Sequence, residues 1–156
     1  MTAHNYNATL TWTGAAKGPT ANYASFSRDY TATISGKAPL KGSADPNYKG
    51  DPALHNPEDM LLIALSACHM LTYLAYAALK KVVVVSYEDA ATGTLEVERT
   101  TGQFKEVVLH PVVTIAKGSD PTLAQALHED AHRDCFIARS VNFPVRHEPK
   151  IIEAAG

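Results

Sequence analysis

The chain has 156 residues, of which 46% are hydrophobic and 19% charged, the size and composition of one globular domain with a sizeable core. A formal net charge of -2 gives no electrostatic basis for binding nucleic acid or an anionic membrane surface. Two cysteines are too few for the disulfide framework of a small secreted protein, and the N-terminal residues lack the basic start and apolar centre of a signal peptide. We therefore expect a cytoplasmic protein with a single domain, residues 1–156.

The first third of the chain is predicted to form strands and loops. Loose alternation of apolar residues over 5–12 indicates a strand, and residues 14–19 indicate a turn. Residues 23–35, rich in Tyr, Phe, Thr and Ile, predict one or two further strands. Prolines and glycines spread over 36–55 predict a long ordered loop, and a loop of that length inside a compact domain is usually functional.

A long helix is predicted next, from about Pro57 to Lys80. Asn56 is a good N-cap, and Pro57 suits the first helical position. Within this helix, the 20 residues from Met60 to Leu79 contain no Asp, Glu, Lys or Arg. A run of that length could span a bilayer. Polar residues interrupt it, however, and the helix is capped like those of water-soluble proteins, so we expect a core helix and no membrane partner.

The second half of the chain predicts more strands and one more helix. We expect strands over 82–85, 93–99, 104–116 and 143–152. The second helix begins at Pro121, after a cap at Ser119 or Asp120. Its apolar stripe repeats every four residues through Leu123, Leu127, Ala131 and Cys135. These elements predict an α+β fold, in which a long central apolar helix and a second helix pack on an antiparallel sheet.

The two cysteines, Cys68 in the long helix and Cys135 at the end of the second, allow three interpretations. Buried cysteines that act as small hydrophobic residues are common. A metal site is the second interpretation, because His132 and Cys135 have helical ligand spacing and His69 adjoins Cys68. Adjacent helical residues point about 100° apart, however, which disfavours one tetrahedral ion, and a solvated helix face explains His128 and His132 equally well. The third interpretation is a redox-active dithiol.

Family resemblance bears on this third interpretation. Residues Asn56–Leu62 (NPEDMLL), followed by Cys68 after a small residue, resemble the signature of the osmotically inducible protein C and organic hydroperoxide resistance family. A second cysteine beyond a helix, here Cys135, and an Arg-Asp step, here at Arg28, are also similar to the family's pattern. The resemblance covers nearly the whole chain, from about residue 9 to residue 145.

The resemblance implies an intertwined homodimer that reduces organic hydroperoxides, alkyl or lipid, without a cofactor or metal. It implies that the Cys68 thiolate attacks the peroxide and that Cys135 resolves the resulting sulfenic acid as a disulfide. Arg28 would stabilise the thiolate and Glu58 would hold the guanidinium. The family draws its electrons from a dithiol, including lipoyl groups on proteins. Phe136 stands where the family often has proline, so the backbone that presents Cys135 is expected to differ.

The spacing of Glu58 and Cys68 bears on how such a site is built. They are ten residues apart on one helix, hence roughly 15 Å apart along its axis. At that distance Glu58 cannot orient an arginine that also contacts the Cys68 sulfur of the same chain. We therefore expect Arg28 and Glu58 to come from the partner subunit, across two long helices packed antiparallel about a two-fold axis. Such packing would also cover a helix that is apolar all round. The rival function is a non-catalytic binding module that holds an apolar ligand in the same cleft.

Overall fold

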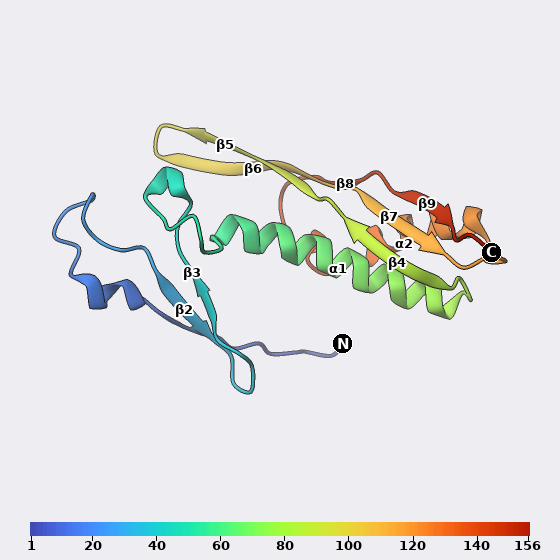
Figure 1. The fold of residues 1–156 in the computed structure, drawn as a ribbon, viewed down its shortest axis with the longest axis horizontal. Coiled ribbons are helices and arrows are strands. Elements are labelled where there is room, and N and C mark those ends of the chain that lie inside the picture. Colours follow the sequence, from blue (N-terminus) through green and yellow to red (C-terminus); the bar gives the residue numbers. More distant parts are fainter. The chain divides into compact units, whose positions relative to one another are not determined.

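The computed structural model describes all 156 residues, and the chain divides into two compact units, Met1–Leu61 and Leu62–Gly156. Figure 1 shows the elements of both units along the chain. Helix α1, Pro57–Leu79, begins in the first unit and runs through the second. The expectation that residues 1–156 form one domain stays a prediction.

The first unit contains a three-stranded antiparallel sheet with the order β1-β2-β3. Its strands are β1 (Thr9–Thr11), β2 (Tyr30–Thr33) and β3 (Leu40–Gly42). The strand predicted over 23–35 is therefore shorter than expected. The loop predicted over 36–55 contains β3 and a short 3-10 helix at Pro46–Tyr48. The predicted turn over 14–19 is largely replaced by a 3-10 helix, Thr13–Lys17.

Helix α1 begins where the sequence predicts. Asn56 Oδ1 accepts a hydrogen bond from the Asp59 backbone N–H at 2.8 Å, while the Asn56 backbone N–H donates to Asp59 Oδ2 at 3.2 Å. This reciprocal cap satisfies backbone donors that the first helical turn leaves free. The helix ends before Lys81, whose φ of 62° is left-handed and stops the helical hydrogen-bond pattern.

One face of α1 is buried and another is open. By length and composition α1 could cross a membrane, a test that the core helix of a water-soluble protein also passes. The residues buried on it, Leu65, His69, Tyr73 and Ala77, recur every four positions. Two large apolar side chains on α1, Ile63 and Leu71, are more than half exposed, at 55% and 62%. The apolar surface of α1 is therefore only partly covered within the chain.

The second unit contains two three-stranded sheets, with orders β4-β7-β9 and β5-β6-β8. Their strands are β4 (Val84–Asp89), β5 (Thr92–Glu98), β6 (Thr101–Leu109), β7 (Pro111–Ile115), β8 (Val145–His147) and β9 (Lys150–Glu153). In each sheet one pair is antiparallel and one is parallel, β7 with β9 and β6 with β8. The sheets are thus mixed, whereas the sequence predicts an antiparallel sheet.

Each extended segment of this unit passes from one sheet to the other at a short break. The breaks fall at residues 90–91 between β4 and β5, at His110 between β6 and β7, and at residues 148–149 between β8 and β9. They are joined to one another, because the His110 backbone N–H donates to Asp89 Oδ1 at 2.6 Å and the Glu148 backbone N–H donates to the Leu109 carbonyl at 2.8 Å. This is why residues 104–116 and 143–152, each predicted as one strand, form two strands each.

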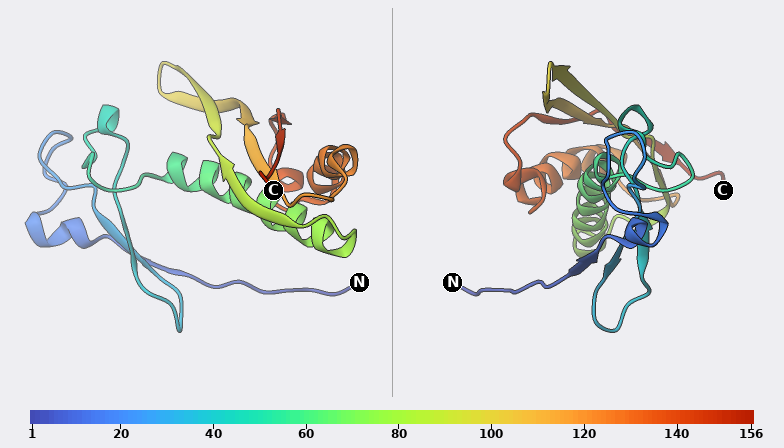
Figure 2. Two further views of the ribbon diagram at one scale, coloured as in Figure 1. Left: turned by 45° about the vertical axis from the view of Figure 1, so that its right-hand side comes forward. Right: turned by 90° about the vertical axis from the view of Figure 1, so that its left-hand side faces the viewer.

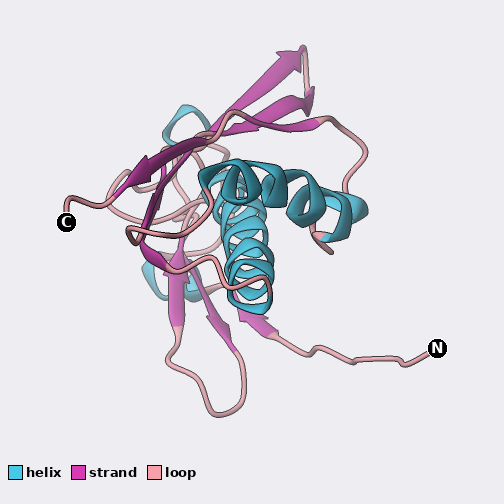
Figure 3. Ribbon diagram, turned by 90° about the vertical axis from the view of Figure 1, so that its right-hand side faces the viewer, coloured by secondary structure: helices cyan, strands magenta, loops and turns pink.

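The core of the second unit lies between α1, β7 and helix α2, Pro121–Asp134. Its buried residues include Tyr73 and Ala77 of α1, Val113 and Ile115 of β7, and Ala124, Leu127 and Ala131 of α2. Val113 and Ile115 lie on the same face of the strand, so both helices pack against one side of the sheet. Figure 2 shows α1 and α2 beside the strands of this unit, and Figure 3 shows the same layers coloured by element type. The predicted α+β class is confirmed.

The Asp120 cap of α2 gives a stability prediction. Asp120 Oδ1 accepts from the Thr122 and Leu123 backbone N–H groups at 2.9 and 3.1 Å. Asp120→Ala removes both bonds and should lower the free energy of unfolding by about 1 kcal/mol, measured by urea denaturation. Asp120→Asn, which retains the capping oxygen, is the matched control. Equal stability of the alanine and asparagine variants would contradict the assigned cap.

Candidate functional site

Cys68 lies in the middle of α1 and lines an open pocket of about 610 Å³. The pocket wall is mostly apolar, with Leu71 from the next turn of α1 and Phe136 from the segment after α2. Cys68 is half-buried, and its backbone carbonyl accepts a 2.8 Å hydrogen bond from Thr72 Oγ1. A thiol at this position can meet a small apolar molecule that enters the pocket.

Cys135 lies beside Cys68, although 67 positions separate them in the sequence. It caps the C-terminal end of α2 in an extended conformation and is only 1% exposed. Burial first, and then the neighbouring Cys68, raise the pKa of the Cys135 thiol to about 11. Both cysteines are free thiols. The structure thus pairs one thiol that lines a pocket with one that is enclosed and protonated at neutral pH.

A polar contact ties α1 to the end of α2 next to the cysteine pair. The Tyr76 hydroxyl donates to Asp134 Oδ2 at 2.6 Å, and Arg133 binds both oxygens of Asp134 at 3.1 and 2.9 Å. Tyr76 lies two helical turns after Cys68, and both line the same pocket. This contact was not predicted from the sequence. The available signal was the position of Asp134, which directly precedes Cys135.

Arg28 and Glu58 both lie in the first unit, but no ion pair joins them in the single chain. The Arg28 guanidinium donates to the carbonyls of Phe26 and Tyr23 and lies over the Phe26 ring, 3.6 Å from its centroid. Glu58 Oε2 is buried without a hydrogen-bond partner. Burial first, and then the nearby Glu58 carboxylate, raise the pKa of Tyr30. Arg28 is therefore held by its own loop, and Glu58 has a carboxylate oxygen that lacks a hydrogen-bond donor.

Four histidines and Tyr73 form a stacked cluster on the buried side of α1. His69 Nε2 and His128 Nδ1 are 3.0 Å apart and share one hydrogen bond. The His128 ring stacks on Tyr73 with centroids 4.0 Å apart, and His147 stacks on His69 at 5.5 Å. His132 lies 5.3 Å from His147. A solvated face for His128 is wrong, because this side chain is fully buried, whereas His132 is half-buried.

Burial keeps this histidine cluster neutral. Burial first, and then the neighbouring imidazoles, lower the pKa of His69 to about 4 and that of His128 to about 3. His128 Nε2 and His147 Nδ1 are buried without a hydrogen-bond partner, so a proton added there would have no acceptor. No three His, Cys, Asp or Glu side chains of the single chain are grouped so that they could hold a metal ion.

Comparison with known proteins identifies related sequences and folds. Residues 50–150 match the family model described as OsmC-like protein. An OsmC-like protein of unknown function from Vibrio cholerae is 34% identical with a TM-score of 0.84, over 94% of this chain and 99% of the other. No curated protein gives a match.

Two solved structures of organic hydroperoxide resistance proteins share the fold at lower identity. The protein from Legionella pneumophila is 18% identical with a TM-score of 0.67, over 97% of this chain and 99% of the other. The protein from Elizabethkingia anophelis, with thiocyanate bound, is 18% identical with a TM-score of 0.68, over 98% of this chain and 99% of the other. At these identities the likeness shows the fold alone.

The neutral histidine cluster predicts that acid destabilises the protein. The pKa values of His69 and His128 are lower in the folded state than in the unfolded chain, so the unfolded chain takes up more protons below about pH 6.5. The free energy of unfolding should fall by about 2 kcal/mol or more between pH 7 and pH 5, and should keep falling until the folded-state values of about 4 and 3 are passed.

Urea denaturation at pH 7 and pH 5 measures this loss. His128→Phe, which retains a planar ring against Tyr73, should make stability less dependent on pH. His55→Gln is the control, because the His55 side chain is 68% exposed. A pH dependence that is unchanged in His128→Phe would contradict the role assigned to the cluster.

Proposed function

This chain belongs to the OsmC-like family, and we propose that it is a thiol-dependent peroxidase that reduces organic hydroperoxides in oxidative-stress defence. The observation that carries this proposal is the pairing of Cys68, which lines an apolar pocket, with the enclosed Cys135. The names of structural neighbours support it, since two are called organic hydroperoxide resistance proteins.

Cys68 is the proposed peroxidatic residue. Its thiolate attacks the outer oxygen of the hydroperoxide, so that an S–O bond forms, the O–O bond breaks and an alkoxide leaves and takes up a proton. The pocket supports an alkyl substrate, because Leu71 and Phe136 both line it. Phe136, which replaces the proline often found after the second cysteine, contributes apolar surface at this entrance and is 79% exposed.

Cys135 is the proposed resolving residue. Its sulfur attacks the sulfenic acid on Cys68, an S–S bond forms, and the S–O bond breaks to release water with the Cys135 proton. The raised pKa of Cys135, caused by burial, keeps it protonated and therefore a poor competitor for peroxide. Its position beside Cys68 favours the condensation, because a sulfenic acid reacts with the nearest thiol before further oxidation.

A composite site in a homodimer would supply the missing cation. Arginine suits this role because it remains charged when partly buried and its donor fork can hold a thiolate and a departing oxygen together. We assign the role to Arg28 of the partner subunit, with Glu58 as the carboxylate that orients it. The unpartnered Glu58 Oε2 and the exposed Leu71 on α1 support this assembly, since each lacks a contact that a second subunit could provide.

The oxidised pair requires two electrons to return to the dithiol state. We propose an external dithiol as the donor, a lipoyl group on a protein being one example, through exchange at the Cys68–Cys135 disulfide. A reducing cytoplasm is the compartment in which such a pair acts as a catalyst and not as a structural bond.

The cysteine roles predict different outcomes for two conservative variants. Cys68→Ser should abolish consumption of an organic hydroperoxide. Cys135→Ser should retain the first turnover but accumulate sulfinic and sulfonic acid at Cys68, because no thiol condenses with the sulfenic acid. Peroxide consumption with a dithiol reductant, followed by mass spectrometry of the treated protein, measures both effects.

The rival binding module predicts a different result from the same samples. If Cys68 and Cys135 are passive, peroxide at low excess should leave both as thiols and Cys68→Ser should behave like the parent protein. Absence of a Cys68–Cys135 linkage after treatment would exclude the dithiol mechanism.

A heterodimer tests whether Arg28 acts across the interface. We expect a dimer made from one Arg28→Ala chain and one Cys68→Ser chain, purified through two different tags, to have about half of the parent activity per dimer, because one complete site remains. Each homodimer of these variants should be nearly inactive. An inactive heterodimer would mean that Arg28 serves the cysteine of its own chain. Light scattering that finds a monomer in a sample with full peroxidase activity would refute the dimer.

A further inference from the structure

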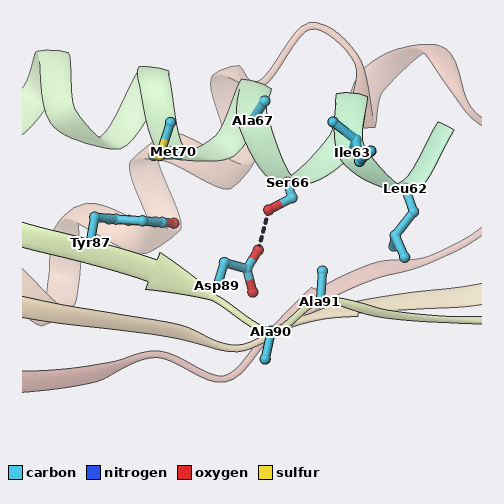
Figure 4. A pocket seen from close by; sticks show the side chains of 9 residues that line it. All are labelled: Leu62, Ile63, Ser66, Ala67, Met70, Tyr87, Asp89, Ala90 and Ala91. Carbon is cyan, nitrogen blue, oxygen red and sulfur yellow. Dashed lines mark hydrogen bonds between the residues drawn. The ribbon is translucent and has the colours of Figure 1, made fainter. Parts of the chain in front are cut away.

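A second pocket, of about 370 Å³, lies on the second unit and contains no cysteine. One wall is α1, through Leu62, Ile63 and Met70, and the other is the end of β4 with the break before β5. Figure 4 shows the residues of both walls, with Ser66 of α1 and Asp89 of β4 facing each other. The volume is at the low end of the range for small-molecule sites, about 300–1,000 Å³.

The polar groups of this pocket gather at one end. Ser66 Oγ donates to Asp89 Oδ2 at 2.5 Å, and Asp89 Oδ1 accepts from the His110 backbone N–H at 2.6 Å. Each carboxylate oxygen can accept a further hydrogen bond, since each has two lone pairs. Asp89 is therefore a fixed acceptor, held by α1 on one side and by the β6–β7 break on the other.

Tyr87 supplies a donor without an acceptor. Its hydroxyl oxygen is buried and has no hydrogen-bond partner. The ring extends from β4 below Met70, with its hydroxyl turned toward the side where Ser66 and Asp89 meet (Figure 4). Burial and then the nearby Asp89 raise the pKa of Tyr87, so the group keeps its proton at neutral pH. A buried hydroxyl without a partner is costly, which points to a group that enters the pocket and accepts from it.

We propose that this pocket binds a small amphipathic alcohol, whose hydroxyl accepts from Tyr87 and donates to Asp89 while its alkyl part lies along Leu62, Ile63 and Met70. A hydroxyl is the simplest head group that meets both needs at one atom. A carboxylate would face the negative charge of Asp89, and an ammonium group has no lone pair for Tyr87. The site is independent of the peroxidase proposal, because Cys68 lines the other pocket and the two share only the Ala67 wall.

Titration of the full-length protein with 1-octanol tests the proposal, with octanoate and octylamine as matched chains that carry other head groups. Calorimetry or ligand-observed NMR should show that 1-octanol binds about fivefold or more tightly than either ion. Tyr87→Phe should weaken 1-octanol binding by about fivefold without lowering the stability of the free protein, because it removes an unpartnered buried hydroxyl. Ala91→Leu, which fills the pocket from the β4–β5 break, should abolish binding.

Tyr76→Phe is the matched control, since it makes the same chemical change in the pocket of Cys68, where the hydroxyl is already bonded to Asp134. Unchanged 1-octanol affinity in this variant supports the proposed site. Four outcomes overturn the proposal: no 1-octanol binding, tighter binding of octylamine, loss of affinity in Tyr76→Phe and not in Tyr87→Phe, or destabilisation of the dimer by Tyr87→Phe. The last outcome would mean that a second copy of the chain provides the acceptor.

Discussion

The stack of Tyr73, His128 and His69 determines how α1 is rotated in the second unit. His69 and Tyr73 are one helical turn apart, and both are held against His128 of α2, by a 3.0 Å hydrogen bond and by a 4.0 Å ring stack. Neighbouring helical residues differ by about 100° in direction, so turning His69 into the core turns Cys68 to the edge of that core. There it meets the end of α2, and hence Cys135. The site thus depends on aromatic packing that takes no part in its chemistry.

The breaks in the strands likewise fix the position of a polar side chain, Asp89, beside the face of α1 that points away from Cys68. An uninterrupted strand has its backbone groups paired along its length and its side chains alternating between the two faces. At the step from one sheet to the other, Asp89 bonds to the freed backbone N–H of His110 and to Ser66 of α1. A carboxylate that replaces missing ladder bonds is thereby fixed within a pocket. Asp89 therefore satisfies a backbone N–H group and also serves as an acceptor in the proposed binding pocket.

The features that depend on local sequence were predictable, and those that depend on distant partners were not. The start of α1 at Asn56 and the start of α2 at Asp120 follow from caps that bond within three residues. The division of residues 104–116 into β6 and β7 depends on β8 and β9, which come much later in the chain. The burial of His128 likewise depends on α1, where its partner His69 lies 59 positions away in the sequence. The helical pattern alone predicts a solvated residue at position 128.

The single chain leaves apolar side chains of α1 exposed and buried polar atoms without partners, and these concern two different terms in the free energy. Exposed apolar side chains on α1 favour a covering surface through the hydrophobic effect, and this term has no direction. The orphan oxygen of Glu58 and the orphan hydroxyl of Tyr87 are directional, and they require opposite partners, a donor for the carboxylate and an acceptor for the phenol. A guanidinium can satisfy the first but never the second, since it has no acceptor atom. One contact with an arginine therefore cannot complete both sites, which is the physical reason to treat the pocket of Tyr87 as separate from the chemistry at Cys68.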